Sequence, residues 1–248
     1  QRQKVVDFVP IYLAKERLER ELATLYKDQL LELYRQNHNP KNKELDAISM
    51  GKRAIKNRVL RILSALENRE VIDIVREQYE ESLTMTDRVV ALDILENITS
   101  EEGEIALNDF YNRYKEDTLV MNKYFAILAA SHRNGTLDRV IALENDEVYD
   151  EKVPNLVRSL IGVFARNYKH FHAIDGHGYS FVADKIIEID KINPQMASGL
   201  ASAYKIYERL NNENKELMKK ELERVLAVPA LSKNAYEIIS KILKVDDK

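Results

Sequence analysis

The segment from Tyr12 to Asn37 reads YLAKERLERELATLYKDQLLELYRQN, and its apolar residues recur mostly at intervals of three or four positions. Charged residues occupy most of the positions between them. This spacing places the apolar side chains on one face of an amphipathic helix, which we expect to end near residues 38–40. The residues that define the face are Leu18, Leu22, Leu25, Leu30, Leu33 and Tyr34.

The same helical pattern recurs along the rest of the chain, and no strand candidate exceeds a few residues. The breaks carry helix start or stop signals, including Asn68, Thr84, Ser100 and the pair Asn134-Gly135. The pattern therefore predicts an all-α fold of about twelve helices. The further helices are expected at 46–65, 70–81, 86–98, 101–115, 119–133, 137–144, 154–167, 179–190, 194–210, 212–228 and 232–243.

Short connections between consecutive helices predict how the helices pack. Each helix should pack antiparallel to its sequence neighbours, and a row of such pairs forms a superhelical solenoid with a concave face that suits a partner. No fixed-period signature of the tetratricopeptide or ankyrin kind is present. No long linker divides the chain either, so we expect one domain over residues 1–248.

Composition excludes several classes of protein. The 248 residues include 45% hydrophobic ones, enough for a substantial core, while the 38 basic and 41 acidic residues are interleaved and give a net charge of −3. Because no region carries a single sign of charge, nucleic acid and membrane surfaces are not expected as partners.

The absence of cysteine and of long apolar runs bears on the compartment. Without cysteine there is neither a disulfide framework nor a thiolate metal site, which fits a cytoplasmic protein. No apolar run approaches the roughly 18 to 20 residues that a membrane span needs, and the first residues lack a signal-peptide core. The chain also starts without Met, which suggests a piece of a longer protein.

The stretch FHAIDGHGYSF, residues 171–181, raises the question of a metal site. His170, His172, Asp175 and His177 are residue types that bind zinc, but residues two apart on a helix point to different faces, so convergence requires irregular backbone. The alternative is a turn between helices that uses Gly176 and Gly178. We favour the turn.

Other catalytic signatures are absent from the sequence. The chain has no H-E-x-x-H motif, no G-x-S-x-G turn and no cysteine nucleophile. The sequence DGHGY also lacks the Lys-Ser/Thr pair and the preceding strand of a phosphate-binding loop. By itself the chain is not equipped for catalysis.

Two predicted helix starts carry candidate binding residues. Pro154 stands at a first helical position with Arg158 one turn further, and Asn193 caps a helix that begins Pro194-Gln195. A helix N-terminus offers unpaired N–H groups and partial positive charge, so Arg158 or Gln195 beside it could hold a carbonyl or carboxylate. The structural alternatives are an ion pair for Arg158 and a solvated polar residue for Gln195.

Five motifs in order resemble the C-terminal helical domain of bacterial aminopeptidase N, in the alanyl aminopeptidase family of zinc metallopeptidases. The C-terminal sequence ALSKNAYEIISKIL also resembles the end of that domain. The resemblance runs over almost the entire chain. The motifs are MTDRVVAL (85–92), LVMNKYFAI (119–127), PNLVRSLIGVFARN (154–167), FHAIDGHGYSF (171–181) and NPQMAS (193–198).

The resemblance implies a function for the parent protein. Enzymes of this family remove N-terminal residues from peptides with zinc-activated water, and the zinc ligands lie in a catalytic domain that this chain lacks. In the family the helical domain closes over the catalytic domain and leaves a chamber for short peptides. The expected partners are therefore the catalytic domain of the same polypeptide and short peptide substrates, and the fragment alone should be inactive.

The resemblance also implies substrate-channel residues. The family's Arg in P-N-x-V-R-S matches Arg158, and its Gln in N-P-Q-x-A-S matches Gln195; no catalytic or metal-binding residue is expected here. The sequence departs from the family pattern at Gly199, where Arg is usual, and at His177, where Ser is usual. One cationic contact to the substrate is thus either missing or supplied elsewhere.

A second hypothesis is a stand-alone helical-repeat scaffold that binds a protein or peptide. An upstream H-E-x-x-H helix with a later Glu would favour the aminopeptidase, whereas a start codon directly before Gln1 would favour the scaffold.

Overall fold

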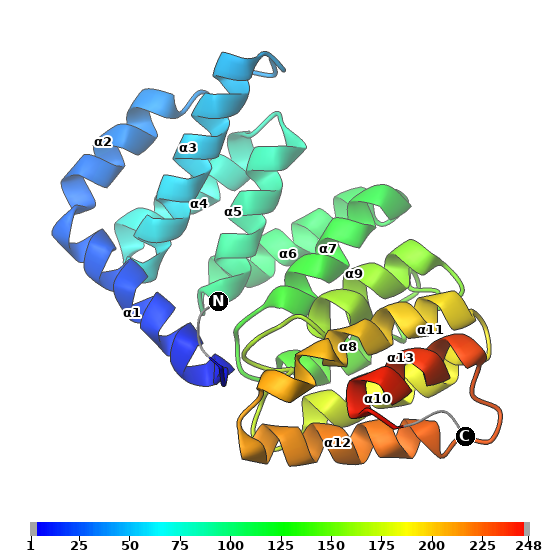
Figure 1. Cartoon of the computed structure of the whole chain (residues 1–248). Coiled ribbons are helices and arrows are strands. Elements are labelled where there is room, and N and C mark those ends of the chain that lie inside the picture. Colours follow the sequence, from blue (N-terminus) through cyan, green and yellow to red (C-terminus); the bar gives the residue numbers. More distant parts are fainter. Residues whose placement is uncertain (1–3, 246–248) are drawn as a thin grey trace. The chain divides into compact units, whose positions relative to one another are not determined.

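A computed structural model describes residues 4–245, and within these residues the chain is all-α, as predicted. It contains thirteen α-helices and two 3-10 helices, and the only β-type pairing among these residues is an isolated bridge between Val6 and Leu210 (Figure 1). No helix in this part of the chain has the length and apolar character that crossing a bilayer requires.

The chain divides into two compact units, which we describe separately. The first is Leu13–Ile127, and the second combines the described residues up to Tyr12 with those from Leu128 onward. The interpretation of residues 1–248 as one domain stays a prediction.

In the first unit several helices pack on their sequence neighbours. α2 packs on α3, α4 on α5 and α5 on α6. The predicted start signals are confirmed: Asn68, Thr84 and Ser100 cap α4, α5 and α6 through their side-chain oxygens. The helices are α1 (Phe8–Leu25), α2 (Lys27–Asn37), α3 (Ala47–Leu63), α4 (Arg69–Glu81), α5 (Met85–Asn97), α6 (Glu101–Tyr114) and α7 (Thr118–Ala130), with a 3-10 turn at Ser64–Leu66; α1 and α7 extend past the limits of the unit.

The predicted helix from Tyr12 to Asn37 is two helices, because the backbone leaves the helical conformation at Tyr26 (φ −118°, ψ 24°). The sequence contains the cause. The apolar spacing lengthens to five residues between Leu25 and Leu30, which rotates the apolar face of one half relative to the other. The bend lets α2 bury Leu31 and Tyr34, whereas α1 buries only Ala23.

A buried polar network joins α2, α3, α4 and α5. Lys56 Nζ lies 2.9 Å from Asp87 Oδ2, and both side chains are almost fully buried. Asn57 donates to Asp87 Oδ1, while Gln78 donates to Asn57 Oδ1 and accepts from the hydroxyl of Tyr34. A buried charge is costly unless it is paired and hydrogen-bonded, so these contacts fix how the four helices fit together.

The second unit contains the remaining helices, packed around fully buried aromatic residues. α11 packs on α10, α13 and α9, and α10 packs on α12 (Figure 1). The predicted helix over 194–210 is α-helical only to Ala201 and continues as a 3-10 helix, Ser202–Arg209. The α-helices are α8 (Thr136–Leu143), α9 (Pro154–Phe164), α10 (His177–Asp190), α11 (Pro194–Ala201), α12 (Asn212–Leu226) and α13 (Lys233–Leu243).

The connection from α9 to α10 confirms the predicted turn and assigns different roles to its two glycines. Gly176 has φ +72°, a conformation that side chains disfavour. Gly178 lies in the first turn of α10, where a Cβ atom would stand 2.5 Å from His170 O and 2.8 Å from Phe171 Cα. Only glycine lets α10 begin this close to the preceding loop.

We predict that Gly178→Ala lowers the free energy of unfolding by about 1 to 3 kcal/mol, because backbone atoms must move to admit the methyl group. The measurement is the urea concentration at the unfolding midpoint. Gly51→Ala in α3 is the matched control, since its Cβ would meet nothing within 4 Å. The control should match or exceed the wild type, because Ala favours helices over Gly. Equal midpoints for all three proteins would contradict the close approach.

Candidate functional site

The structure brings Arg158 and Gln195 together in one pocket of the second unit. The pocket has a volume of about 370 Å³ and lies between α9, α11 and the start of the following 3-10 helix. Its ten lining residues are Arg158, Gly162, Ala165, Arg166, Gln195, Met196, Gly199, Leu200, Ser202 and Ala203.

Arg158 projects from the second turn of α9, whose first residue is Pro154, as predicted. Its side chain is exposed, and its guanidinium donates to Asn155 Oδ1 over 3.1 Å. The ion pair considered as the structural alternative is not formed with any residue between 4 and 245. The guanidinium therefore keeps donors for a ligand.

Gln195 follows the first residue of α11, and its surroundings match the predicted cap. Asn193 Oδ1 accepts from the backbone N–H of Met196 at 3.1 Å, and Pro194 occupies the first helical position. The side chain of Gln195 is exposed. An amide here can both donate and accept beside the positive end of the helix.

Gly199 lies one turn after Gln195 and leaves its side of the pocket open. A Cβ atom at Gly199 would meet nothing within 4 Å, so a larger side chain would have room there. Across the pocket, a Cβ at Gly162 would lie 3.8 Å from Leu200 Cδ2, which is ordinary contact. Packing therefore does not require a glycine at position 199, and the open space results from the absence of a side chain there.

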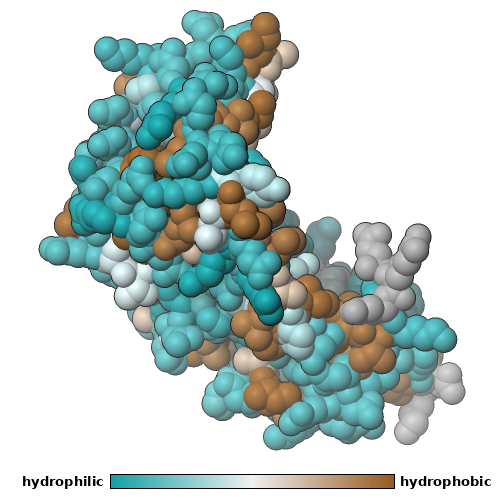
Figure 2. Space-filling model, turned by 90° about the vertical axis from the view of Figure 1, so that its left-hand side faces the viewer, coloured by the Kyte–Doolittle hydropathy of each residue, from teal (hydrophilic) through white to brown (hydrophobic). Residues whose placement is uncertain are grey.

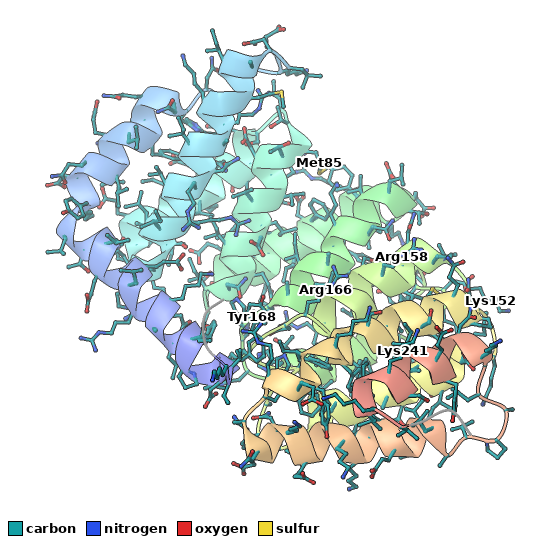
Figure 3. The ribbon with its side chains drawn as sticks, in the orientation of Figure 1. Met85, Lys152, Arg158, Arg166, Tyr168 and Lys241 are labelled. Carbon is teal, nitrogen blue, oxygen red and sulfur yellow. The ribbon has the colours of Figure 1, made fainter. Side chains whose placement is uncertain are left out.

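Arg166 is a pocket residue that the sequence analysis missed. It follows the end of α9 by two residues and is exposed, and its side chain has no ion pair or hydrogen bond within the described part of the chain. Figure 3 labels it near the end of α9, with Arg158 nearer the start of that helix. In the predicted helix 154–167 the spacing 158, 162, 166 would have placed Arg166 on the face of Arg158, although the observed α9 ends at Phe164.

Comparison with known families assigns the fold. A family profile described as "Domain of unknown function (DUF3458_C) ARM repeats" matches residues 1–244. The chain belongs to this family. Armadillo-type repeats stack helix pairs. The prediction that this chain is an all-α helical-repeat domain is therefore confirmed.

Curated relatives confirm the resemblance to the C-terminal part of bacterial aminopeptidase N. Aminopeptidase N of Caulobacter vibrioides is 31% identical over 97% of this chain, and that of Escherichia coli is 31% identical over 96%. The chain spans only 28% of the length of each. A crystal structure of Legionella pneumophila aminopeptidase A in complex with aspartic acid matches with a TM-score of 0.89 at 27% identity, covering 98% of this chain and 29% of that one.

His172 and His177, on either side of the α9–α10 turn, have separate contacts and do not converge. His172 is buried, with its Nδ1 atom 2.8 Å from the hydroxyl of Tyr179, whereas the side chain of His177 is 74% exposed and lies 3.5 Å from Asp175. Between residues 4 and 245, no three or more His, Asp or Glu side chains are grouped so that they could hold a metal ion.

His172 belongs to a hydrogen-bonded aromatic cluster. Asn214 Nδ2 donates both to His172 O and to the hydroxyl of Tyr179, and this hydroxyl is hydrogen-bonded to His172 Nδ1. Phe8 stacks on the ring at 4.0 Å, and Phe171 meets the ring of Tyr179 edge-on. Burial lowers the pKa of His172 from 6.5 to about 4.

We predict that this histidine makes the domain acid-sensitive. Above pH 6.5 His172 is neutral in both states, but as the pH falls from 6.5 to about 4 only the unfolded chain takes up the proton. Folding stability should therefore fall by up to about 3 kcal/mol across this range. His172→Gln should reduce the fall, measured as the difference between urea midpoints at about pH 7 and about pH 4.5.

Exposed His177 provides the control. His177→Gln should keep the wild-type difference between the two midpoints, because this side chain lies outside the buried cluster. A His172→Gln protein with the full wild-type difference would show that another group causes the acid sensitivity.

Proposed function

We propose that this chain is the C-terminal part of a zinc-dependent aminopeptidase that removes N-terminal residues from peptides. In this role it closes the catalytic chamber and lines the channel through which short peptides reach the active site. The observation that carries the proposal is the pocket: the two residues that the resemblance marks as channel-lining, Arg158 and Gln195, lie on different helices and line one cavity.

The proposed contribution of this chain is substrate binding. Arg158 is permanently charged and can donate two parallel hydrogen bonds, while Gln195 can pair with a peptide group as donor and acceptor. Both suit the part of a peptide beyond the bond that is cut. The pocket volume of about 370 Å³ falls within the range of small-ligand sites.

The zinc ion of the proposed enzyme does not fit the residues of this chain. Residues 4–245 offer no group of three or more candidate ligands, and the sequence lacks H-E-x-x-H. Zinc bound by an additional catalytic domain would polarise the scissile carbonyl and activate water. We therefore assign no catalytic step to this chain. A cytoplasmic location stays a prediction.

The proposed partner is the catalytic domain of the same polypeptide. α1 exposes several large apolar side chains, among them Leu13, Leu18 and Leu25, and buries only Ala23. On the face drawn in Figure 2, hydrophobic side chains stand in separate groups among hydrophilic ones. Such exposed groups are typical of surfaces that another domain covers.

An activity assay tests the proposal directly. We expect the full-length parent to cleave an alanyl chromogenic amide in the presence of zinc, and the 248-residue chain to leave it intact under the same conditions. Release of the chromophore is the measurement. Cleavage by the chain alone, or none by the parent, would contradict the assignment. An H-E-x-x-H motif upstream of Gln1 would separate the enzyme from the stand-alone scaffold.

We further predict that Arg158→Ala in the full-length enzyme lowers kcat/KM more for a peptide than for a chromogenic amide that has no residue after the cut bond. A charge-assisted contact to the remote part of a substrate contributes roughly 1 to 3 kcal/mol. The measurement is the ratio of the two kcat/KM values. An equal loss for both substrates would indicate a structural arginine.

A further inference from the structure

The pocket between α9 and α11 has an unbalanced charge. Two of its ten lining residues, Arg158 and Arg166, are cations and none is acidic. Neither guanidinium forms an ion pair with a residue between 4 and 245. In contrast, the long basic side chains of Arg69, Arg76 and Lys185 each contact a carboxylate. The pocket therefore offers two uncompensated positive charges to a ligand.

The distance between the two arginines indicates the length of a ligand that could contact both. Six residues of α9 and the two residues of the following turn separate the Cα atoms of Arg158 and Arg166 by roughly 13 Å along the helix direction. An extended peptide covers this length with about three or four residues. A short peptide lying along α9 would thus present a backbone carbonyl to Arg158 and a carboxylate to Arg166.

The remaining walls suit a small peptide. Leu200, Met196 and Ala203 provide apolar surface, Gln195 provides one amide, and Gly199 leaves open space in front of α11. A guanidinium binds a carboxylate through two parallel hydrogen bonds, and the absence of a competing acid within the pocket leaves both donors available.

We propose that Arg166 is a carboxylate-binding residue of this pocket and that it selects short peptides that end in a free carboxylate. This inference rests on the proposed function, because the ligand is the substrate of the parent enzyme. It goes beyond that function by adding a residue with a stated ligand group and by predicting a preference for unblocked peptides.

The test uses the full-length parent and four substrates. Tetra-alanine carries the terminal carboxylate, and its C-terminal amide lacks it. A tetrapeptide amide with Asp at the last position carries a side-chain carboxylate instead, and an alanyl chromogenic amide carries no residue after the cut. The variants are Arg166→Gln, which removes the charge, Arg166→Lys, which keeps a charge without the planar fork, and Lys191→Gln, which removes an exposed cation outside the pocket.

We expect Arg166→Gln to raise KM for tetra-alanine about tenfold, the effect of one charge-assisted contact. The wild type should already show this higher KM for tetra-alanine amide, and Arg166→Gln should raise it no further. Arg166→Lys should restore part of the loss. Lys191→Gln should match the wild type on every substrate, and the chromogenic amide should be cleaved equally by all four proteins.

Other results would argue against a role of Arg166 in binding the terminal carboxylate. If Arg166→Gln affects only the Asp-containing amide and leaves tetra-alanine unchanged, the proposed preference for a free C-terminal carboxylate is refuted. Equal losses for tetra-alanine and its amide, or a loss on the chromogenic amide, would overturn it. A parent that cleaves the chromogenic amide and responds to Arg158→Ala but not to Arg166→Gln would refute this inference alone. A parent that cleaves none of the substrates would refute the proposed function.

Discussion

In the unit that contains the pocket, the contact between Gly178 and the preceding loop determines where α10 begins. The backbone of residues 170 and 171 occupies the space that a side chain at Gly178 would fill. This approach buries Phe171 beside Tyr179, and the hydroxyl of Tyr204 donates to Tyr179 O from the 3-10 helix that follows α11. Because Gly178 has no side chain, the loop after α9, the start of α10 and the chain after α11 can pack together in one aromatic core.

The pocket is a consequence of that core. α11 packs on both α10 and α9, so fixing α10 against the α9–α10 loop also fixes the distance between the two walls that carry Arg158 and Gln195. At the other end of α10, the buried Asp190 accepts from the backbone N–H of Ser232 at 2.6 Å, which anchors the start of α13. The proposed binding residues are exposed, while their positions depend on buried residues outside the pocket.

The two units use different interactions to specify their packing. Residues 13–127 are organised by the buried Lys56–Asp87 pair and its amide partners, whose directional bonds allow few alternative arrangements. The other unit relies on close-packed aromatic rings and on a neutral histidine. Burial keeps the pKa of His172 low, since a charged ring among Phe8, Phe171 and Tyr179 would lose its hydration without gaining a counter-ion.

The sequence by itself determined the helical class and most helix starts, because apolar spacing and capping residues act over one or two turns. It also marked Arg158 and Gln195 as candidate binding residues, beside two helix starts and within motifs that resemble the family's. The role of Gly178 required tertiary structure, since it depends on the backbone of residues 170 and 171 that approaches the first turn of α10. The bend at Tyr26 has a local signal, the five-residue interval between Leu25 and Leu30, whereas the 3-10 segment after Ala201 was not predicted. Only the folded unit revealed Arg166 as a pocket residue. Whether a cation is paired or free depends on neighbours that the order of residues does not specify.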